Sequence, residues 1–311
     1  MQFRSLIDVR PPYYALHSVT PSASEIRAQV RREHPLGHEV GPLAAAEAGR
    51  HLAILGACAC SSVREPAALH YYLAHRARII GYRDPAAEQA REFTASARAV
   101  SSTAREARAQ AVLRAVGSHA LLYELDVTYK VLSRPVFERL FAAHRRDLRA
   151  QPRDEASSQL ADIERRTNPY RQPIPLNITQ RDAHGVRAEL DEVKPEMCAG
   201  HFPMYPALPV AILMHSLSTL SGEALRARWG DSMRYRLLRA DVFADRLAFA
   251  GERLQFAARY VSDAPGAEQY EATACLADGS QVGRLVIDLE PYAVSDVRRG
   301  APRLQQLWAE Q

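Results

Sequence analysis

The strongest constraint in the sequence is a proline-punctuated loop that leads directly into an apolar helix. Residues 200–209 read Gly-His-Phe-Pro-Met-Tyr-Pro-Ala-Leu-Pro, with Pro203, Pro206 and Pro209 at a spacing of three. Each proline fixes its own φ angle and biases the residue before it away from the α region, so the loop stays extended. Pro209 suits the first position of a helix, where the N–H that proline lacks has no partner anyway. The sequence therefore predicts an extended loop and then a helix over residues 209–228.

The predicted helix carries a broad apolar face. Its apolar residues recur three and four positions apart, which places them on one side of an α-helix. They are Val210, Leu213, Met214, Leu217, Leu220 and Ala224, and Ile212 widens the same face. This pattern predicts that the helix is buried in a core.

The first half of the chain repeats this plan. Residues 24–30 alternate like a half-buried strand, and residues 34–42 form a turn-rich loop. Residues 43–58 are rich in alanine and nearly continuous in apolar residues, so they predict a second buried helix. In the second half, residues 186–193 take the place of the strand before the loop. Because strand, loop and helix occur twice, the sequence predicts an internal duplication.

Four further strands are predicted after each helix. Each is a run of β-forming residues that ends at turn residues, and Asp278-Gly279 is a hairpin signal between the last two. The predicted strands span residues 69–81, 92–101, 107–116 and 120–132 in the first half, and 236–242, 253–261, 270–276 and 281–289 in the second.

The length of 311 residues exceeds what one core usually serves, so we expect two structural units. Residues 135–149 predict a short amphipathic helix, and residues 151–175 are polar, charged and punctuated by proline, as in a linker. We therefore predict an N-terminal unit over residues 1–134, a helical linker over 135–175 and a C-terminal unit over 176–311.

The loop and helix of the second half resemble the active-site segment of the β-hydroxyacyl thioester dehydratases of fatty acid synthesis, a hotdog-fold family. That family's motif runs H-F-P-G-x-P-x-x-P-G and then reaches an acidic residue on the helix. The residues that match are His201, Phe202, Pro203, Pro206 and Pro209, whereas Met204 and Val210 replace the glycines and His215 stands at the acidic position. The resemblance implies an α+β fold, a double hotdog in which two antiparallel sheets each wrap around a central helix.

The resemblance also implies where the active site lies. Hotdog dehydratases take the histidine from the loop of one unit and the carboxylate from the central helix of its partner, so a fused pair forms a pseudo-dimer. Glu47-Ala48 resembles the family's Glu-Ala pair, which implies a site with His201 and Glu47 as catalytic residues. The implied substrate-binding residues are Phe202, Met204, Tyr205, Pro209 and Val210, and His34 or His38 with His215 forms a degenerate second site.

Each of these residues also has a structural interpretation. His201 suits a loop that has lost its function, and Glu47 suits a buried ion pair, for instance with Arg50. His34, His38 and His215 suit interior histidines with satisfied hydrogen bonds. The sequence leaves both interpretations open.

The function implied by the resemblance is dehydration of a β-hydroxyacyl group on acyl carrier protein or coenzyme A, in fatty acid or polyketide-type biosynthesis. That reaction needs a base for the C2 proton and an acid for the departing hydroxyl. One alternative is a hotdog thioesterase or acyltransferase, in which the helix acid activates the acceptor and the loop histidine is dispensable. Another is a non-catalytic module that binds acyl chains or a carrier protein.

Composition narrows the partners. We find no nucleic-acid-binding motif and no uncharged run long enough to span a bilayer, and the start of the chain lacks a secretory signal, so we expect a cytoplasmic protein. The four cysteines form no ligand-spaced set, so we predict no metal and no cofactor. The net charge of +4, mostly from arginine, suits an acidic carrier protein or a phosphate-bearing coenzyme. Association of two chains into a homodimer stays open.

Overall fold

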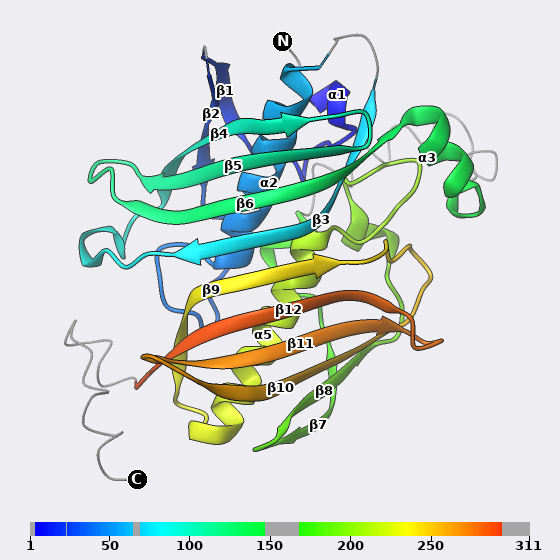
Figure 1. Ribbon diagram of the computed structural model, residues 1–311. Helices are drawn as coiled ribbons and strands as arrows, with labels where there is room; N and C mark the ends of the chain where they lie inside the picture. Colours follow the sequence, from blue (N-terminus) through cyan, green and yellow to red (C-terminus); the bar gives the residue numbers. More distant parts are fainter. Residues whose placement is uncertain (1–3, 23, 65–68, 147–167, 294–311) are drawn as a thin grey trace.

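A single antiparallel sheet of twelve strands dominates the part of the chain that the computed structural model describes, residues 4–22, 24–64, 69–146 and 168–293 (Figure 1). The strand order is β1-β2-β4-β5-β6-β3-β9-β12-β11-β10-β8-β7. The first half contributes β1 (His17–Pro21), β2 (Ile26–Arg31), α2 (Ala45–Ser62), β3 (His70–Gly81), β4 (Glu92–Ser102), β5 (Glu106–Ala115) and β6 (Leu121–Ser133). The second contributes β7 (Asn177–Asp182), β8 (Gly185–Leu190), α5 (Val210–Trp229), β9 (Arg234–Ala244), β10 (Leu254–Ala264), β11 (Ala267–Leu276) and β12 (Gln281–Tyr292).

The two halves have the same topology. In each half, two strands precede the central helix and four follow it, and the strand order of the second half mirrors that of the first. Figure 1 shows α2 behind the strands of the first half and α5 behind those of the second. The predicted α+β double hotdog and the predicted duplication are therefore confirmed.

The halves meet through hydrogen bonds between strands as well as through side chains. β3 pairs with β9 in antiparallel register, from Arg76 opposite Phe243 to Ile80 opposite Arg239. The two expected sheets therefore form one continuous sheet. Strand β3 ends the strand order of the first half, strand β9 begins that of the second, and the two pair at the seam. This seam also brings α2 and α5 into contact.

Most predicted elements are present with boundaries a few residues away from those expected. Strands β1 and β7 were not predicted, because these edge strands are largely exposed and lack an apolar face. The predicted linker helix is observed as α3 (Arg134–Leu140) and a 3₁₀ turn (Ala142–His144). Residues 147–167 of the predicted linker lie outside the described residues, so the three unit boundaries stay a prediction. Within the described residues, no helix is long and apolar enough to cross a membrane.

Small residues let α2 approach the sheet closely. The hydroxyl of Tyr129 on β6 donates to the carbonyl oxygen of Ala53 at 2.6 Å. A Cβ atom added at Gly56 would lie 2.6 Å from that same hydroxyl, so only glycine fits there. The alanine-rich composition of α2 therefore reflects its close packing against the strands of the first half.

The N-terminal segment crosses from the first half to the loop of the second. It begins with α1 (Arg4–Ile7), and Val9 then forms a bridge with His201. The N–H of Arg10 donates to the carbonyl oxygen of Gly200 at 2.7 Å. A Cβ at Gly200 would lie 2.2 Å from the carbonyl oxygen of Arg10, and the φ of Gly200 is +78°, so glycine is required on both counts. The segment that starts the chain therefore holds the loop that the sequence singled out.

The seam offers a direct test of the fold. An added Cβ at Gly81, at the end of β3, would lie 2.5 Å from the backbone carbonyl oxygen of Leu237 on β9. We expect Gly81→Ala to lower the free energy of unfolding by about 1–3 kcal/mol, the usual cost of overpacking. Chemical denaturation measures this loss.

The matched control is Gly49→Ala in α2. The nearest atom to its added Cβ is the Ile79 Cδ1 at 3.8 Å, an ordinary contact. Alanine is favoured over glycine inside a helix by about 1 kcal/mol, so this variant should be at least as stable as the parent. If Gly81→Ala were as stable as Gly49→Ala, the seam would not be closely packed at Gly81.

Candidate active site

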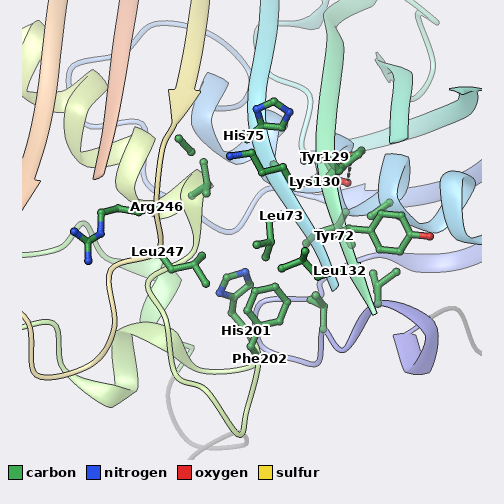
Figure 2. Close-up of a pocket in the computed structure, with 18 of the residues that line it drawn as sticks. Tyr72, Leu73, His75, Tyr129, Lys130, Leu132, His201, Phe202, Arg246 and Leu247 are labelled. Carbon is green, nitrogen blue, oxygen red and sulfur yellow. Dashed lines mark hydrogen bonds between the residues drawn. The ribbon is translucent and has the colours of Figure 1, made fainter. Parts of the chain in front are cut away.

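A cavity of about 310 Å³, here called the outer cavity, opens beside His201. Its walls come from both halves: Ala53, Ile54 and Ala57 of α2 form one side. The loop residues His201 and Phe202 and the turn after β9 form another, as Figure 2 shows. Most of the lining is apolar, so the outer cavity suits a ligand with a hydrocarbon part.

The His201 imidazole is held in one tautomer. Its Nδ1 lies 2.8 Å from the carbonyl oxygen of Ala207. A carbonyl can only accept a hydrogen bond, so Nδ1 carries the proton and Nε2 keeps the lone pair. Burial lowers the pKa of His201 to about 4, although the hydrogen bond to Ala207 acts in the opposite direction. At neutral pH the side chain is therefore a neutral base.

The loop conformation fixes the direction of this ring. Phe202 adopts a positive φ of 49°, and its ring stacks on the His201 ring with the centroids 4.0 Å apart. Residues 202–205 form a turn closed by a hydrogen bond from the N–H of Tyr205 to the carbonyl oxygen of Phe202 at 2.8 Å, so the prediction of a loop extended over residues 200–209 is wrong at this turn. Beyond the turn, Ala207 is bridged to Phe249, and the N–H of Leu208 donates to the carbonyl of Ala248. These backbone contacts hold the acceptor Ala207 in place.

Two of the five predicted substrate-binding residues line the outer cavity, namely Phe202 and Val210. Tyr205 is fully buried and packs edge-on against the ring of Phe137. Met204 accepts a backbone hydrogen bond from Arg146, and Pro209 caps α5. Met204, Tyr205 and Pro209 are not among the lining residues, because the loop turns their side chains toward other parts of the core.

The start of α5 presents backbone N–H groups near the same cavity. Val210 is the first residue of the helix and lines the outer cavity. The N–H groups of Ile212 and Leu213 donate to the carbonyl oxygen of Pro209, so the first N–H groups without an acceptor in the helix are those of Val210 and Ala211. The helix dipole gives this end partial positive charge, which favours a negative charge beside Val210.

Glu47 lies in a different environment from the one predicted. It is completely buried, and its Oε1 accepts a hydrogen bond from the backbone N–H of Glu33 at 2.6 Å. Its Oε2 accepts one from the N–H of His34 at 3.2 Å. Burial raises the pKa of Glu47, and these two hydrogen bonds partly oppose that effect. The carboxyl group thus holds the loop of its own half.

The predicted pairing of Glu47 with His201 in one cavity is not observed, since Glu47 is not among the residues that line the outer cavity. The reason is its position along the helix. Glu47 is the third residue of α2, whereas His215, at the family's acidic position, is the sixth residue of α5. The sixth residue of α2 is Arg50. The loop before α2 is shorter than the loop before α5. Matching Glu47-Ala48 to the family's Glu-Ala pair therefore selected a residue about one helical turn before the position that corresponds to His215.

Arg50 connects the two environments. Its guanidinium forms an ion pair with Glu33, and its NH1 group lies 3.1 Å from the Nε2 of His34. The guanidinium also lies 5.9 Å from the ring centroid of Tyr13, which packs edge-on against His201 at 5.1 Å. Sequence reasoning named Arg50 only as a partner for Glu47, and Tyr13 carried no signal because its role depends on tertiary packing.

The structure brings His34 and His215 together and leaves His38 apart. The rings of His34 and His215 stack with their centroids 5.3 Å apart, beside Glu47. Burial and the charge of Arg50 lower the pKa of His34 to about 2, so this imidazole is neutral. His38 is exposed, and its backbone carbonyl accepts a hydrogen bond from Tyr235.

Three side chains here, the partly buried Glu33 and the buried Glu47 and His51, have the spacing of metal ligands. Side-chain ligand atoms of Glu33, Glu47 and His51 all lie within 4.8 Å of one another. Glu33 already pairs with Arg50, and both oxygens of Glu47 accept backbone hydrogen bonds. These contacts describe a buried ion-pair network with its carboxylates already engaged, and we assign it no ligand.

Two exposed basic residues, Lys130 of β6 and Arg246 after β9, are among those that line the outer cavity, and His75 of β3 lies beside Lys130 (Figure 2). The Arg246 side chain points away from His201 in Figure 2, and its guanidinium donates to the hydroxyl of Ser280 at 2.7 Å. Burial lowers the pKa of His75, and the neighbouring charge of Lys130 adds to this effect. Among the described lining residues, the one carboxylic acid is the exposed Asp245. The mouth therefore suits an anionic group, while the interior is apolar.

Comparison with known proteins supports the fold. No protein-family model matches the chain, and no curated protein sequence matches it significantly. Among solved structures, a TesB protein of Mycobacterium avium subspecies paratuberculosis is similar with a TM-score of 0.56 and 11% identity, covering 88% of this chain and 96% of that one.

Two further solved structures are similar over most of the chain. An acyl-ACP thioesterase from Bacteroides thetaiotaomicron has a TM-score of 0.53 and 12% identity, covering 86% of this chain and 98% of its own. A hot dog fold protein from Alicyclobacillus acidocaldarius has a TM-score of 0.53 and 10% identity, covering 92% and 99%. At these identities the similarity establishes the double hotdog fold and nothing finer.

The environment of Glu47 predicts a structural cost on substitution. In Glu47→Gln, an amide NH₂ group replaces one of the two carboxylate oxygens. This donor then faces the backbone N–H of Glu33 or His34, which is also a donor. We expect the free energy of unfolding to fall by about 1–3 kcal/mol, the cost of a buried group left without its partner. Urea denaturation monitored by circular dichroism measures the change.

Glu92→Gln is the control, because the Glu92 side chain is 60% exposed and pairs with Arg31 at the surface. A surface pair contributes at most about 1 kcal/mol, so this variant should be nearly as stable as the parent. If Glu47→Gln were equally harmless, the hydrogen bonds to the loop would not hold it in place.

Proposed function

We propose that the chain is an enzyme that processes acyl thioesters in the outer cavity, with His201 as its general base. The observation that carries the proposal is the neutral His201 imidazole, fixed by Ala207 and facing an apolar cavity at the start of a helix. An acyl group suits the apolar walls, and the basic mouth suits the phosphates of its carrier. The solved structures of similar fold include proteins described as acyl-ACP thioesterases, which agrees with this substrate class.

Within this class, hydrolysis accounts best for the groups present. His201 Nε2 removes a proton from water as the water oxygen attacks the thioester carbonyl, and the resulting oxyanion lies at the N–H groups that begin α5. The tetrahedral intermediate then collapses, the C–S bond breaks, and the imidazolium returns its proton to the departing thiolate. An acyltransferase uses the same steps with a hydroxyl or amine in place of water. Each step needs one base and one oxyanion site.

Dehydration of a β-hydroxyacyl thioester is the second candidate. The observation that favours it is the match of His201, Phe202 and three prolines to the dehydratase loop. In that reaction Nε2 removes the C2 proton and returns it to the departing hydroxyl as the C–O bond breaks. The reaction gains from a second acid, and the described lining of the outer cavity offers only the exposed Asp245. We therefore place hydrolysis first.

We also propose that the thioester is carried by acyl carrier protein or coenzyme A. Both carriers bear a phosphopantetheine arm with at least one phosphate. Lys130 and Arg246, which come from different halves, stand at the mouth where such a phosphate would lie while the acyl group occupies the interior. Guanidinium and ammonium groups bind phosphate through charge-assisted hydrogen bonds.

His201→Ala tests the proposed function. With acyl-CoA and acyl-N-acetylcysteamine substrates, the parent should release free thiol, measured with a thiol-reactive dye. We expect the variant to lose at least about a hundredfold in rate, since a positioned general base contributes about 10²–10⁴-fold. The exposed His38 serves as control, and His38→Ala should keep full activity. Enoyl product from a β-hydroxyacyl substrate without free thiol would assign dehydration instead, and full activity of His201→Ala would refute both.

The pH profile provides a second readout of the same group. Since burial holds the pKa of His201 at about 4, its lone pair is available throughout the neutral range. Activity should therefore fall only as the pH drops toward about 4, where the imidazole gains a proton. Circular dichroism at each pH shows that the protein stays folded. An acid limb near pH 6.5, where a free imidazole titrates, would contradict the buried base.

Charge reversal at the mouth tests the carrier. Lys130→Glu and Arg246→Glu should each raise the KM for an acyl-CoA by about tenfold or more, because a hydrogen bond to a charged group contributes about 1.5–3 kcal/mol. The KM for the same acyl group on N-acetylcysteamine, which has no phosphate, should stay unchanged. Arg253→Glu is the control, since Arg253 is exposed and pairs with Asp191 away from the cavity. Equal effects on both substrates would exclude phosphate recognition.

A further inference from the structure

A second cavity, here called the inner cavity, lies at the seam between the halves, next to the outer cavity. It has a volume of about 90 Å³ and is lined by residues of α2, α5 and the strands that these helices pack against, among them the exposed Arg76. Small side chains make the space, notably Ala46 and Gly49 on α2 and Ala211 on α5. The lining is otherwise mostly aliphatic. A space of this kind favours hydrocarbon over water, because it offers water few hydrogen-bond partners.

The two cavities adjoin at four shared residues. Tyr13, Ala53, Ala74 and Val210 line both the outer and the inner cavity. Alanine and valine occupy little room, so Tyr13 is the bulky side chain at this junction. Its ring is 6% exposed and packs edge-on against His201 at 5.1 Å and against Tyr170 at 5.5 Å. Tyr13 therefore lies where the two cavities adjoin.

Tyr13 belongs to the N-terminal segment, which lies outside the duplicated set of elements. Val9 of this segment bridges His201, and the N–H of Tyr14 donates to the carbonyl of Arg10 at 2.8 Å. The backbone just before Tyr13 thus contacts the loop of the second half.

We propose that Tyr13 is a specificity-determining residue that sets the length of acyl chain accepted beside His201. This inference rests on the proposed function, since it places the thioester in the outer cavity. A short acyl chain fits in the outer cavity with the Tyr13 ring in its observed position. A longer chain reaches the inner cavity only when that ring moves aside, and the aliphatic lining then covers the chain end.

The experiment measures kcat/KM along a series of saturated acyl thioesters from acetyl to palmitoyl. Removal of the ring in Tyr13→Ala should raise the ratio of long-chain to short-chain activity by about tenfold or more, because each buried methylene contributes about fourfold. Tyr13→Phe keeps the volume of the ring and should keep the parent's profile. Ala53→Leu fills the junction from the other side and should lower the ratio of long-chain to short-chain activity.

Tyr72→Ala is the matched control. Tyr72 lines the outer cavity only, so this change adds room without opening the junction. Its ratio of long-chain to short-chain activity should change far less than that of Tyr13→Ala. A profile that is the same in the parent, Tyr13→Ala and Ala53→Leu would overturn the proposal. Thermal melts identify variants that are unfolded, and Tyr13→Leu replaces Tyr13→Ala if the latter does not fold.

A binding measurement separates this proposal from the proposed function. Calorimetry with unreactive acyl thioethers of increasing chain length reports occupancy of the cavities without turnover. If no thioester reacts but Tyr13→Ala binds the long thioethers more tightly than the parent, the assigned reaction fails and the role of Tyr13 in chain length stands. If thioesters react and the chain-length preference of Tyr13→Ala equals that of the parent, the proposed reaction is retained and this inference fails.

Discussion

The pairing of β3 with β9 is the constraint on which the rest of the molecule depends. This antiparallel ladder joins two copies of the same unit edge to edge, which places α2 and α5 next to each other. Both cavities lie along that seam and take their walls from both halves. Neither half alone encloses the space beside His201. The duplication is therefore a requirement of the site as well as a feature of its history.

Every polar group that is buried at this seam loses its hydrogen bonds to water and needs a partner within the protein. Arg50 and Glu47 lie on the central helix with no access to solvent, and each is compensated by specific partners. Arg50 pairs with Glu33 and lies near two aromatic rings, while Glu47 accepts two backbone N–H groups. His201 follows the same principle, because its Nδ1 proton is satisfied by a carbonyl. Its Nε2 lone pair is thereby left for chemistry.

The fold was readable from the sequence because periodicity reports burial, and burial defines the elements of each half. The pairing of β3 with β9 could not be predicted from the sequence, since no residue pattern in either strand identifies the strand that it pairs with. Within the candidate site, His201 was singled out by the match of its loop to the dehydratase motif, which needs no tertiary information, and its role stays a prediction. The predicted pairing of Glu47 with His201 in one cavity is not observed, because Glu47 lies about one helical turn before Arg50, the residue that corresponds to His215. Tyr13 joins the site only through a contact between distant segments, which no local pattern encodes.

The residue at the sixth position of α2 bears directly on the choice of reaction. By the duplication, Arg50 occupies the place that corresponds to His215, where the dehydratases that this loop resembles carry an acid. A guanidinium stays protonated and cannot supply a proton to a departing hydroxyl. The charge of Arg50 is also committed to Glu33, behind the ring of Tyr13. Both reactions would use His201 for two proton transfers, but a departing hydroxyl is more basic than a departing thiolate and depends more on a second, well-placed acid. The described lining of the outer cavity offers only the exposed Asp245 for that purpose. The replacement of an acid by a buried cation is therefore the strongest structural argument for placing hydrolysis first.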